Sequence, residues 1–235
     1  MLTNSPPSDV SVPRWHDGVF PRLPDDAEFD RVFPAQVQQS SETHWTPVEV
    51  CLHAAEWLVT GPGTRVLDVG CGPGKFCALG AATTPGHFSG VEQRKQLCRA
   101  ARDMLRHYRF RRVQILHANV TELAFSDFDA FYIFNPFQEN LVPMLKIDAE
   151  VKVEFEYYDR YINYVRGELS QLPLGTRVVT YWGDCDEVPP CYDCMETAFN
   201  GTLRLWVKQR DLTIEQSTLE AMALLTVGES EPLFI

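Results

Sequence analysis

The stretch VLDVGCGPGKF, Val66 to Phe76, constrains the fold of this chain more than any other, because a short apolar run leads directly into a turn with three glycines. Residues 65–69 have the length and apolar composition of a buried strand, and a helical pattern follows from about Lys75 to Ala82. A strand that passes through a turn into a helix is the first half of a strand, helix, strand unit. The stretch therefore predicts an α/β protein.

Strand-like and helix-like segments alternate along the rest of the chain. Further strands are predicted at residues 87–92, 113–118, 128–135, 177–183 and 203–209. Further helices are predicted after Pro47 and at residues 93–109 and 151–172. This order predicts a doubly wound, mostly parallel, Rossmann-like sheet of about seven strands with helices on both faces. No segment of 211–235 stands out as the partner of the strand at 203–209.

The helix after Pro47 carries its own start and stop signals. Thr46 is expected to act as the N-cap and Pro47 to occupy the first helical position, while Gly61-Pro62-Gly63 ends the helix. This helix precedes the first strand, so the segment that opens it, residues 40–47, is expected at the edge of the sheet where ligands bind. His44 and Trp45 are candidates to line a pocket there.

The chain divides into an N-terminal arm, residues 1–40, and one domain, residues 41–235. Six of the sixteen prolines fall within residues 1–34, which show no convincing periodicity. The arm is expected either to pack over the body or, in its first dozen residues, to form a disordered tail.

Composition excludes several classes of protein. No window approaches about 18 consecutive apolar residues, so no membrane span or membrane partner is expected. The N-terminus lacks the basic and apolar regions of a secretory signal, which favours a cytoplasmic location. The seven cysteines are expected to be reduced thiols, and Cys191-x-x-Cys194 lacks the further ligands of a zinc site, so no metal is expected.

The spacing of the glycine turn distinguishes between possible ligands. A phosphate-binding loop of the form G-x-x-x-x-G-K-[ST] would need glycine at Val69 and Ser or Thr at Phe76. A dinucleotide turn of the form G-x-G-x-x-G would need glycine at Lys75. Neither fits, and what remains is D-x-G-x-G-x-G, formed by Asp68, Gly70, Gly72 and Gly74.

This motif resembles the first motif of the class I S-adenosylmethionine (SAM) dependent methyltransferases, and the resemblance extends from about Thr46 to Trp182. It implies SAM as the cofactor and S-adenosylhomocysteine as its product. Glycines would let the backbone approach the amino acid and ribose moieties of SAM without contact from a Cβ atom. Asp68 would attract the ammonium group, and Cys71 would lie within the cofactor-binding turn.

The resemblance implies further cofactor contacts after the next two strands. Glu92 ends the second strand, where a carboxylate accepts hydrogen bonds from both ribose hydroxyls. After the third strand, Asn119 stands where the family usually has an acid, and its side-chain carbonyl would contact the adenine, with Val120 beside it. Thr46 completes the predicted cofactor-binding residues.

The fourth strand ends in Asn135-Pro136-Phe137, which is similar to the [ND]-P-P-[YF] signature of methyltransferases that act on planar nitrogen. In that signature the Asn oxygen and the Pro carbonyl accept hydrogen bonds from the acceptor nitrogen, and an aromatic ring stacks on its plane. One proline is missing here, so Phe137 stands at the second proline position and Gln138 at the aromatic one. Candidates for a general base are Glu139, His44 and Tyr181.

Charge bears on the nature of the acceptor. The net charge of −11 argues against a surface that grips nucleic acid and favours a protein or small-molecule acceptor. Between Arg94 and Arg112, however, eight basic residues accompany a single acid, Asp103. This stretch either tracks the phosphates of an RNA or DNA substrate or is a solvated face paired with acids such as Glu150, Glu154 and Glu156. A silent SAM-binding module used for interaction is the third alternative.

Overall fold

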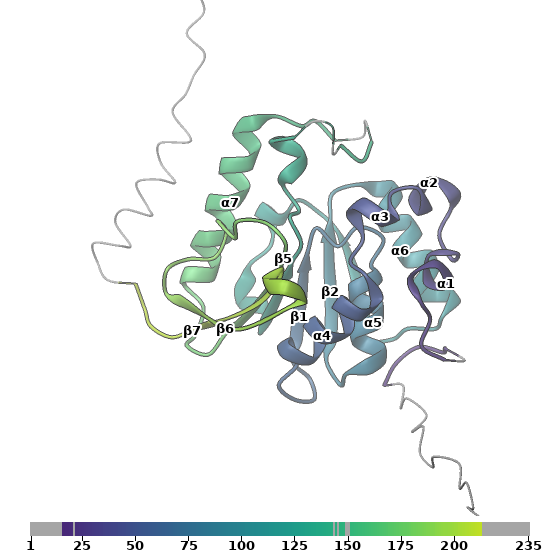
Figure 1. Cartoon of the computed structure of the whole chain (residues 1–235), viewed down its shortest axis with the longest axis horizontal. Helices are drawn as coiled ribbons and strands as arrows, with labels where there is room; N and C mark the ends of the chain where they lie inside the picture. Colours follow the sequence, from purple (N-terminus) through teal and green to yellow (C-terminus); the bar gives the residue numbers. More distant parts are fainter. Residues whose placement is uncertain (1–15, 21, 143, 145, 149–150, 213–235) are drawn as a thin grey trace, which may run out of the picture.

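The computed structural model of the chain describes residues 16–212 apart from residues 21, 143, 145, 149 and 150. Figure 1 shows a central sheet with helices on both of its faces, as the sequence predicts. The predicted disordered start of the arm and any partner strand beyond residue 212 lie outside the described residues.

Seven strands form the sheet, in the order β3-β2-β1-β4-β5-β7-β6. The strands are β1 (Arg65–Val69), β2 (His87–Glu92), β3 (Val113–His117), β4 (Ala130–Ile133), β5 (Arg177–Tyr181), β6 (Tyr192–Ala198) and β7 (Leu203–Lys208). The first five pair in parallel, and β7 pairs antiparallel with both β5 and β6. Strand order reverses at β1, because β2 and β3 lie on one side of it and β4 and β5 on the other. Ligands bind at such a point in open α/β sheets.

The helices lie before or between these strands. They are α1 (Asp26–Asp30), α2 (Ala35–Gln38), α3 (Ser41–His44), α4 (Val48–Leu58), α5 (Lys75–Thr83), α6 (Lys95–His107) and α7 (Phe155–Ser170). Short 3₁₀ turns η1 (Val120–Glu122), η2 (Phe125–Asp127), η3 (Gln138–Asn140) and η5 (Phe199–Gly201) occupy four of the connections.

Each face of the sheet has its own hydrophobic core. Alternate residues of β1 and β4, such as Val66 and Tyr132, pack against α4, α5 and α6, while Leu67 and Phe131 pack on the other side with α7. The two faces are both buried because successive side chains of a strand point in opposite directions. This explains why these strands are apolar throughout rather than alternating.

Two expectations from the sequence are corrected by the structure. The partner of β7 on the outer edge is β6, which precedes it in the chain. The sequence analysis expected this partner strand after β7, within residues 211–235. Most of β6 is exposed and polar, since it lies at the edge of the sheet, so it lacks the apolar signal of a strand. The predicted helix at 151–172 begins later, at Phe155.

Thr46 is also not the N-cap of α4. Pro47 occupies that position, and the hydroxyl of Thr46 is hydrogen-bonded to the buried hydroxyl of Tyr132 at 2.8 Å. The N–H of Val48 is instead satisfied by the carboxylate of Asp26, at 2.8 Å. An acid from α1 therefore fulfils the capping function that the local sequence assigned to Thr46.

Candidate functional site

A cavity of about 920 Å³, including its open mouth, lies at the carboxyl ends of β1 to β4. Its walls come from four consecutive strand-end loops and from the residues just before α4. They comprise Gly70 and Gly72 after β1, residues 91–94 at the end of β2, residues 118–120 after β3, residues 134–139 after β4, and residues 43–45, together with Ile147 and Tyr161.

The glycine turn is shaped by the protein's own side chains. A Cβ atom on Gly70 would lie 2.5 Å from the Cβ of Pro136, and one on Gly72 would lie 2.6 Å from the ring of Trp45. Both glycines also have positive φ, +74° and +52°. Glycine is therefore required at both positions before any ligand is considered, and the turn packs directly against the segment after β4.

Trp45 is held in this place by the arm. Its ring N–H donates a hydrogen bond of 3.0 Å to the carbonyl of Val37 in α2. Trp45 is buried and lines the cavity together with His44, where the sequence predicted both residues. Burial lowers the pKa of His44, so its imidazole is neutral near pH 7 and able to accept a proton.

Three residues of the predicted turn do not line the cavity. Gly74 ends the turn at φ +78° and faces Ala101 of α6. Cys71 is buried, its N–H donates to the carbonyl of Val91 at 2.9 Å, and burial raises the pKa of its thiol well above the usual range. Asp68 lies beneath the turn, within 3.5 Å of the thiol of Cys77. These positions support the turn from below.

The buried Asp68 makes stability depend on pH. Burial raises the pKa of its carboxyl from 3.8 to about 8, so between these values the folded protein holds a proton that the unfolded chain releases. The free energy of unfolding is therefore expected to fall as pH rises from about 4 to about 8. In Asp68→Asn this decrease should be smaller, because the amide does not titrate.

Denaturant unfolding of both proteins at pH 5 and pH 8 measures this contribution. The unfolding free energy of Asp68→Asn relative to that of wild type should be higher at pH 8 than at pH 5. An unchanged difference would show that Asp68 is ionised in the folded protein throughout this range.

The carboxylate of Glu92 is fixed in the cavity wall by backbone hydrogen bonds to both of its oxygens. One carboxylate oxygen accepts a hydrogen bond from the N–H of Gly72 at 3.1 Å, and the other accepts one from the N–H of Arg94 at 2.8 Å. Burial raises the pKa of this carboxyl, and these donors oppose the shift. Each oxygen retains a further lone pair, so the fixed carboxylate can accept two hydroxyl donors from a ligand.

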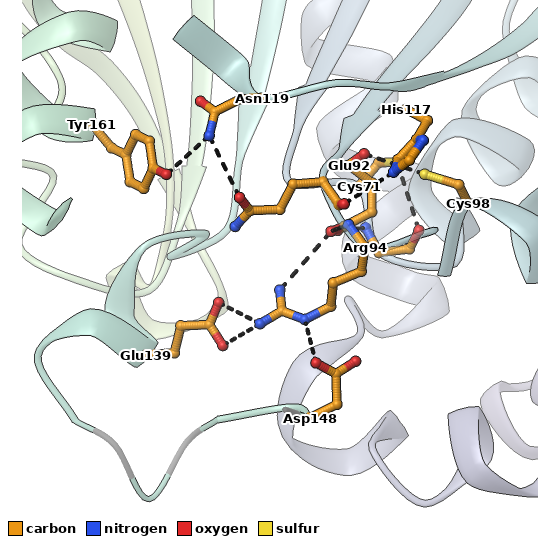
Figure 2. A network of polar contacts seen from close by, with 11 residues as sticks. Cys71, Glu92, Arg94, Cys98, His117, Asn119, Glu139, Asp148 and Tyr161 are labelled. Carbon is orange, nitrogen blue, oxygen red and sulfur yellow. Dashed lines mark hydrogen bonds and ion pairs between the residues drawn. The ribbon is translucent and has the colours of Figure 1, made fainter. Parts of the chain in front are cut away.

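Arg94 connects this acid to the segment after β4. Its guanidinium donates to both oxygens of Glu139, each at 2.6 Å, and its Nε donates to Asp148 at 3.2 Å, as Figure 2 shows. The Arg94 side chain is buried, and Glu92 lies 3.9 Å from its second amino group. From the sequence, Arg94 was assigned only to the basic stretch. Its position two residues after Glu92 could have indicated that it lies beside the cavity. Glu139 is thereby committed to an ion pair, which makes it a poor general base.

Asn119 and Val120 both line the cavity, but the amide of Asn119 is oriented differently from the prediction. Its carbonyl oxygen caps η1 by accepting from the N–H of Thr121 at 3.1 Å. Its NH₂ group donates to the hydroxyl of Tyr161 at 2.9 Å (Figure 2). The carbonyl predicted to contact a ligand is already engaged in capping, while Val120 offers an apolar wall. Thr46 does not line the cavity.

The turn Asn135-Pro136-Phe137 forms the part of the wall that follows β4, whereas Glu92 ends β2 and Asn119 follows β3. Asn135 has a positive φ of 39°, which asparagine tolerates better than most residues. Its side-chain amide makes no hydrogen bond to another described residue, whereas the ring of Phe137 stacks on Tyr161 at 5.1 Å. An unpaired amide in a cavity wall is a group available to a ligand. Tyr181, the third candidate base, packs on Phe134 and does not line the cavity.

Much of the basic stretch is engaged within the protein. Arg102 donates to the carbonyl of Ile115, Arg112 donates to the carbonyls of Gly86 and Ala81, and Arg106 pairs with Asp103. Glu154, one of the acids considered as a partner, pairs with Lys152 instead. Arg112, at the end of the stretch, directly precedes β3. It therefore lies near the amino ends of the parallel strands, whereas the cavity lies at their carboxyl ends.

In the described part of the chain, no group of three or more His, Cys, Asp or Glu side chains could hold a metal ion. Among the helices that the structure describes, none is long and apolar enough to cross a membrane.

Comparison with known proteins adds to this geometry. Residues 66–148 match a family described as a methyltransferase domain. An RNA methyltransferase from Salinibacter ruber, in complex with S-adenosyl-L-homocysteine, has a TM-score of 0.52 at 19% identity, over 72% of this chain and 96% of that one. TrmN from Thermus thermophilus has a TM-score of 0.51 at 16% identity, over 73% of this chain and 51% of that one.

A mutant of MtNAS in complex with S-adenosylmethionine has a TM-score of 0.50 at 15% identity, over 79% of this chain and 72% of that one. At these identities the structural likeness establishes the fold alone. A comparison with curated protein sequences found no match.

Proposed function

We propose that the chain is a class I SAM-dependent methyltransferase, because residues 66–148 match a methyltransferase domain family, and that it methylates a nitrogen atom of a protein or small-molecule acceptor. One observation carries the proposal: Glu92, at the end of β2, and Asn135, after β4, line one cavity, and the amide of Asn135 has no hydrogen-bond partner among the described residues. A donor held at the first can therefore meet an acceptor held at the second. Transfer between two groups held side by side gains much of its rate from their proximity.

The residues of the cavity fit SAM. The carboxylate of Glu92, fixed by Gly72 and Arg94, would accept the two ribose hydroxyls, and Val91 and Val120 would flank the nucleoside with apolar surface. Gly70, Gly72 and Trp45 would border the amino acid moiety, and Asp68 and Cys71 would act through the turn rather than by direct contact. When bound, SAM supplies a methyl group on a positively charged sulfur.

The remaining residues would prepare the acceptor. The side-chain oxygen of Asn135 and the carbonyl of Pro136 would accept hydrogen bonds from the acceptor nitrogen and fix its direction. Phe137, stacked on Tyr161, keeps this turn rigid and excludes water from one wall. The neutral His44 is the candidate that would take up the proton released on transfer.

A nucleic acid acceptor is the second candidate, because RNA methyltransferases are among the proteins with this fold. The net charge of −11 and the internal engagement of Arg94, Arg102 and Arg112 disfavour it. We also propose a cytoplasmic location, since all seven cysteines are free thiols, as is usual in reducing compartments.

Substitution of Glu92 tests the cofactor assignment. Glu92→Gln is expected to weaken binding of SAM and S-adenosylhomocysteine by roughly tenfold or more, because charged hydrogen bonds to the ribose are replaced by weaker neutral ones. Isothermal titration calorimetry of both ligands gives the affinities, with NAD as a negative control. Glu196→Gln, an exposed acid of β6, is the matched variant and should bind like wild type. Absence of SAM binding by the wild-type protein would refute the assignment.

The class of acceptor can be tested with labelled methyl groups. The protein is incubated with methyl-labelled SAM and a cell extract, and portions of the product are treated with protease or nuclease. We expect label in protein or in small molecules. Label that is released by nuclease alone would establish the nucleic acid alternative.

A further inference from the structure

A second cavity lies beside the acceptor turn. Asn135, Pro136, Phe137 and Gln138 line both cavities, so the turn forms a shared wall. The second cavity has a volume of about 510 Å³ including its open mouth, and its other walls are Leu141, the α7 residues Tyr158 and Ile162, and the loop after β5, residues 184–187. In the order of the sheet it lies on the β5 side of the turn, whereas Glu92 and Asn119 lie on the β2 and β3 side.

The lining of this cavity carries negative charge. Asp184, Asp186 and Glu187 contribute three carboxylates, and no Lys or Arg is among the lining residues that the structure describes. Two arginines contact the backbone of this segment, and one of them also contacts a thiol. Arg166 donates to the carbonyl of Asp186, and Arg204 donates to the carbonyl of Gly183 and lies 3.0 Å from the sulfur of Cys185.

Glu187 differs from its two neighbours because it is buried. Only 8% of the residue is exposed, while Asp184 and Asp186 are exposed. Its carboxylate has no hydrogen bond or ion pair with another described residue, and its one hydrogen bond is with its own backbone N–H. Burial raises the pKa of this carboxyl to about 7, with a smaller contribution from Asp186. A buried carboxylate without a partner is costly, and a cationic ligand would relieve that cost.

We propose that this second cavity binds an aliphatic ammonium group of the methyl acceptor, with Glu187 as its buried partner and Asp184 and Asp186 attracting it at the mouth. The inference rests on the proposed function, since it takes Asn135 as the site where the acceptor nitrogen is presented. It also names the substrate class more closely, as an acceptor that carries an aliphatic ammonium group in addition to the nitrogen presented at Asn135. Polyanionic nucleic acid would be repelled by the same carboxylates.

Binding of n-butylammonium, followed by ligand-observed NMR in the presence of S-adenosylhomocysteine, tests the cavity without relying on activity. Neutral n-butanol is the matched probe. The wild-type protein is expected to bind n-butylammonium in preference to n-butanol, and Glu187→Gln should weaken the ammonium about tenfold while leaving n-butanol unchanged. Glu187→Gln is expected to fold, because burial favours a neutral side chain at this position.

Glu196→Gln removes the same charge from the exposed face of β6 and should bind n-butylammonium like wild type. Equal binding by Glu187→Gln and wild type, or equal loss in both variants, would overturn the proposal.

The ammonium site and the proposed function can fail separately. If Glu187→Gln has no effect while wild-type protein still transfers methyl groups through Asn135, the ammonium site is wrong and the function stands. If transfer does not depend on Asn135, the proposed function is wrong at its acceptor site.

Discussion

Asn135→Ala is expected to bind S-adenosylhomocysteine like wild type and to transfer methyl groups roughly 100-fold to 1,000-fold more slowly. The amide lines the cavity without a partner among the described residues, so its loss removes a hydrogen-bond acceptor from the ligand and none from the fold. Removal of one preorganised polar group from an active site typically costs this much in rate. Cofactor affinity should be retained, because the carboxylate of Glu92 is held by Gly72 and Arg94 and not by Asn135. Calorimetry and labelled-methyl transfer measure the two quantities.

Two further substitutions separate chemistry from backbone strain at this position. Asn135 has a φ of 39°, which alanine adopts at some cost. Asn135→Gly relieves that strain and still lacks the amide, so it should be as slow as Asn135→Ala. Asn135→Asp retains an oxygen acceptor and should recover part of the activity. Full activity in Asn135→Gly would exclude the amide from the reaction.

Lys75→Met is expected to lower the free energy of unfolding by about 3–5 kcal/mol, the typical cost of leaving a buried charge without its partner. Lys75 follows the glycine turn and is 2% exposed. Its ammonium lies 2.7 Å from Asp26 and 3.0 Å from Asp30 of α1, and 5.6 Å from the centre of the Phe29 ring. Asp30 is also buried, so methionine would leave its carboxylate uncompensated.

Thermal unfolding measures this effect, and a decrease of about 6–20 °C in the melting temperature corresponds to that loss for a chain of this size. Arg65→Met is the control, because it also removes a basic partner of an aspartate. The pair of Arg65 and Asp129 is largely exposed, so its loss should cost less than about 1 kcal/mol. Equal melting temperatures for Lys75→Met and Arg65→Met would show that Lys75 does not hold the arm to the body.

The contacts of Lys75 also change the interpretation of the arm. The division at residue 40 predicted from the sequence remains a proposal, yet residues 16–40 contribute to the site in two ways. Asp26 caps α4, and Val37 fixes the ring of Trp45 against Gly72. A truncated domain that starts at residue 41 would lose both contacts, so the arm and the cavity are best studied together.

Much of this architecture was determined by the sequence alone. Local patterns sufficed for the alternation of strands and helices, since apolar runs and helical periodicity depend on neighbours in the chain. The spacing of Gly70, Gly72 and Gly74 identified the methyltransferase motif, and Glu92 could be predicted as a site residue because an acid at the end of the second strand needs no knowledge of distant residues. Asn135 could be predicted for the same reason, as part of a short motif after a predicted strand, and both residues line the cavity.

Only the tertiary structure decided which distant groups meet. It paired Arg94 with Glu139 and Lys75 with Asp30, capped α4 with Asp26 instead of Thr46, and turned the carbonyl of Asn119 toward η1. It also brought Glu187 beside the acceptor turn, although Glu187 lies 52 positions after Asn135 in the chain. Buried charges and unsatisfied hydrogen-bond donors choose partners by distance in space, and a local sequence pattern carries no information about that distance.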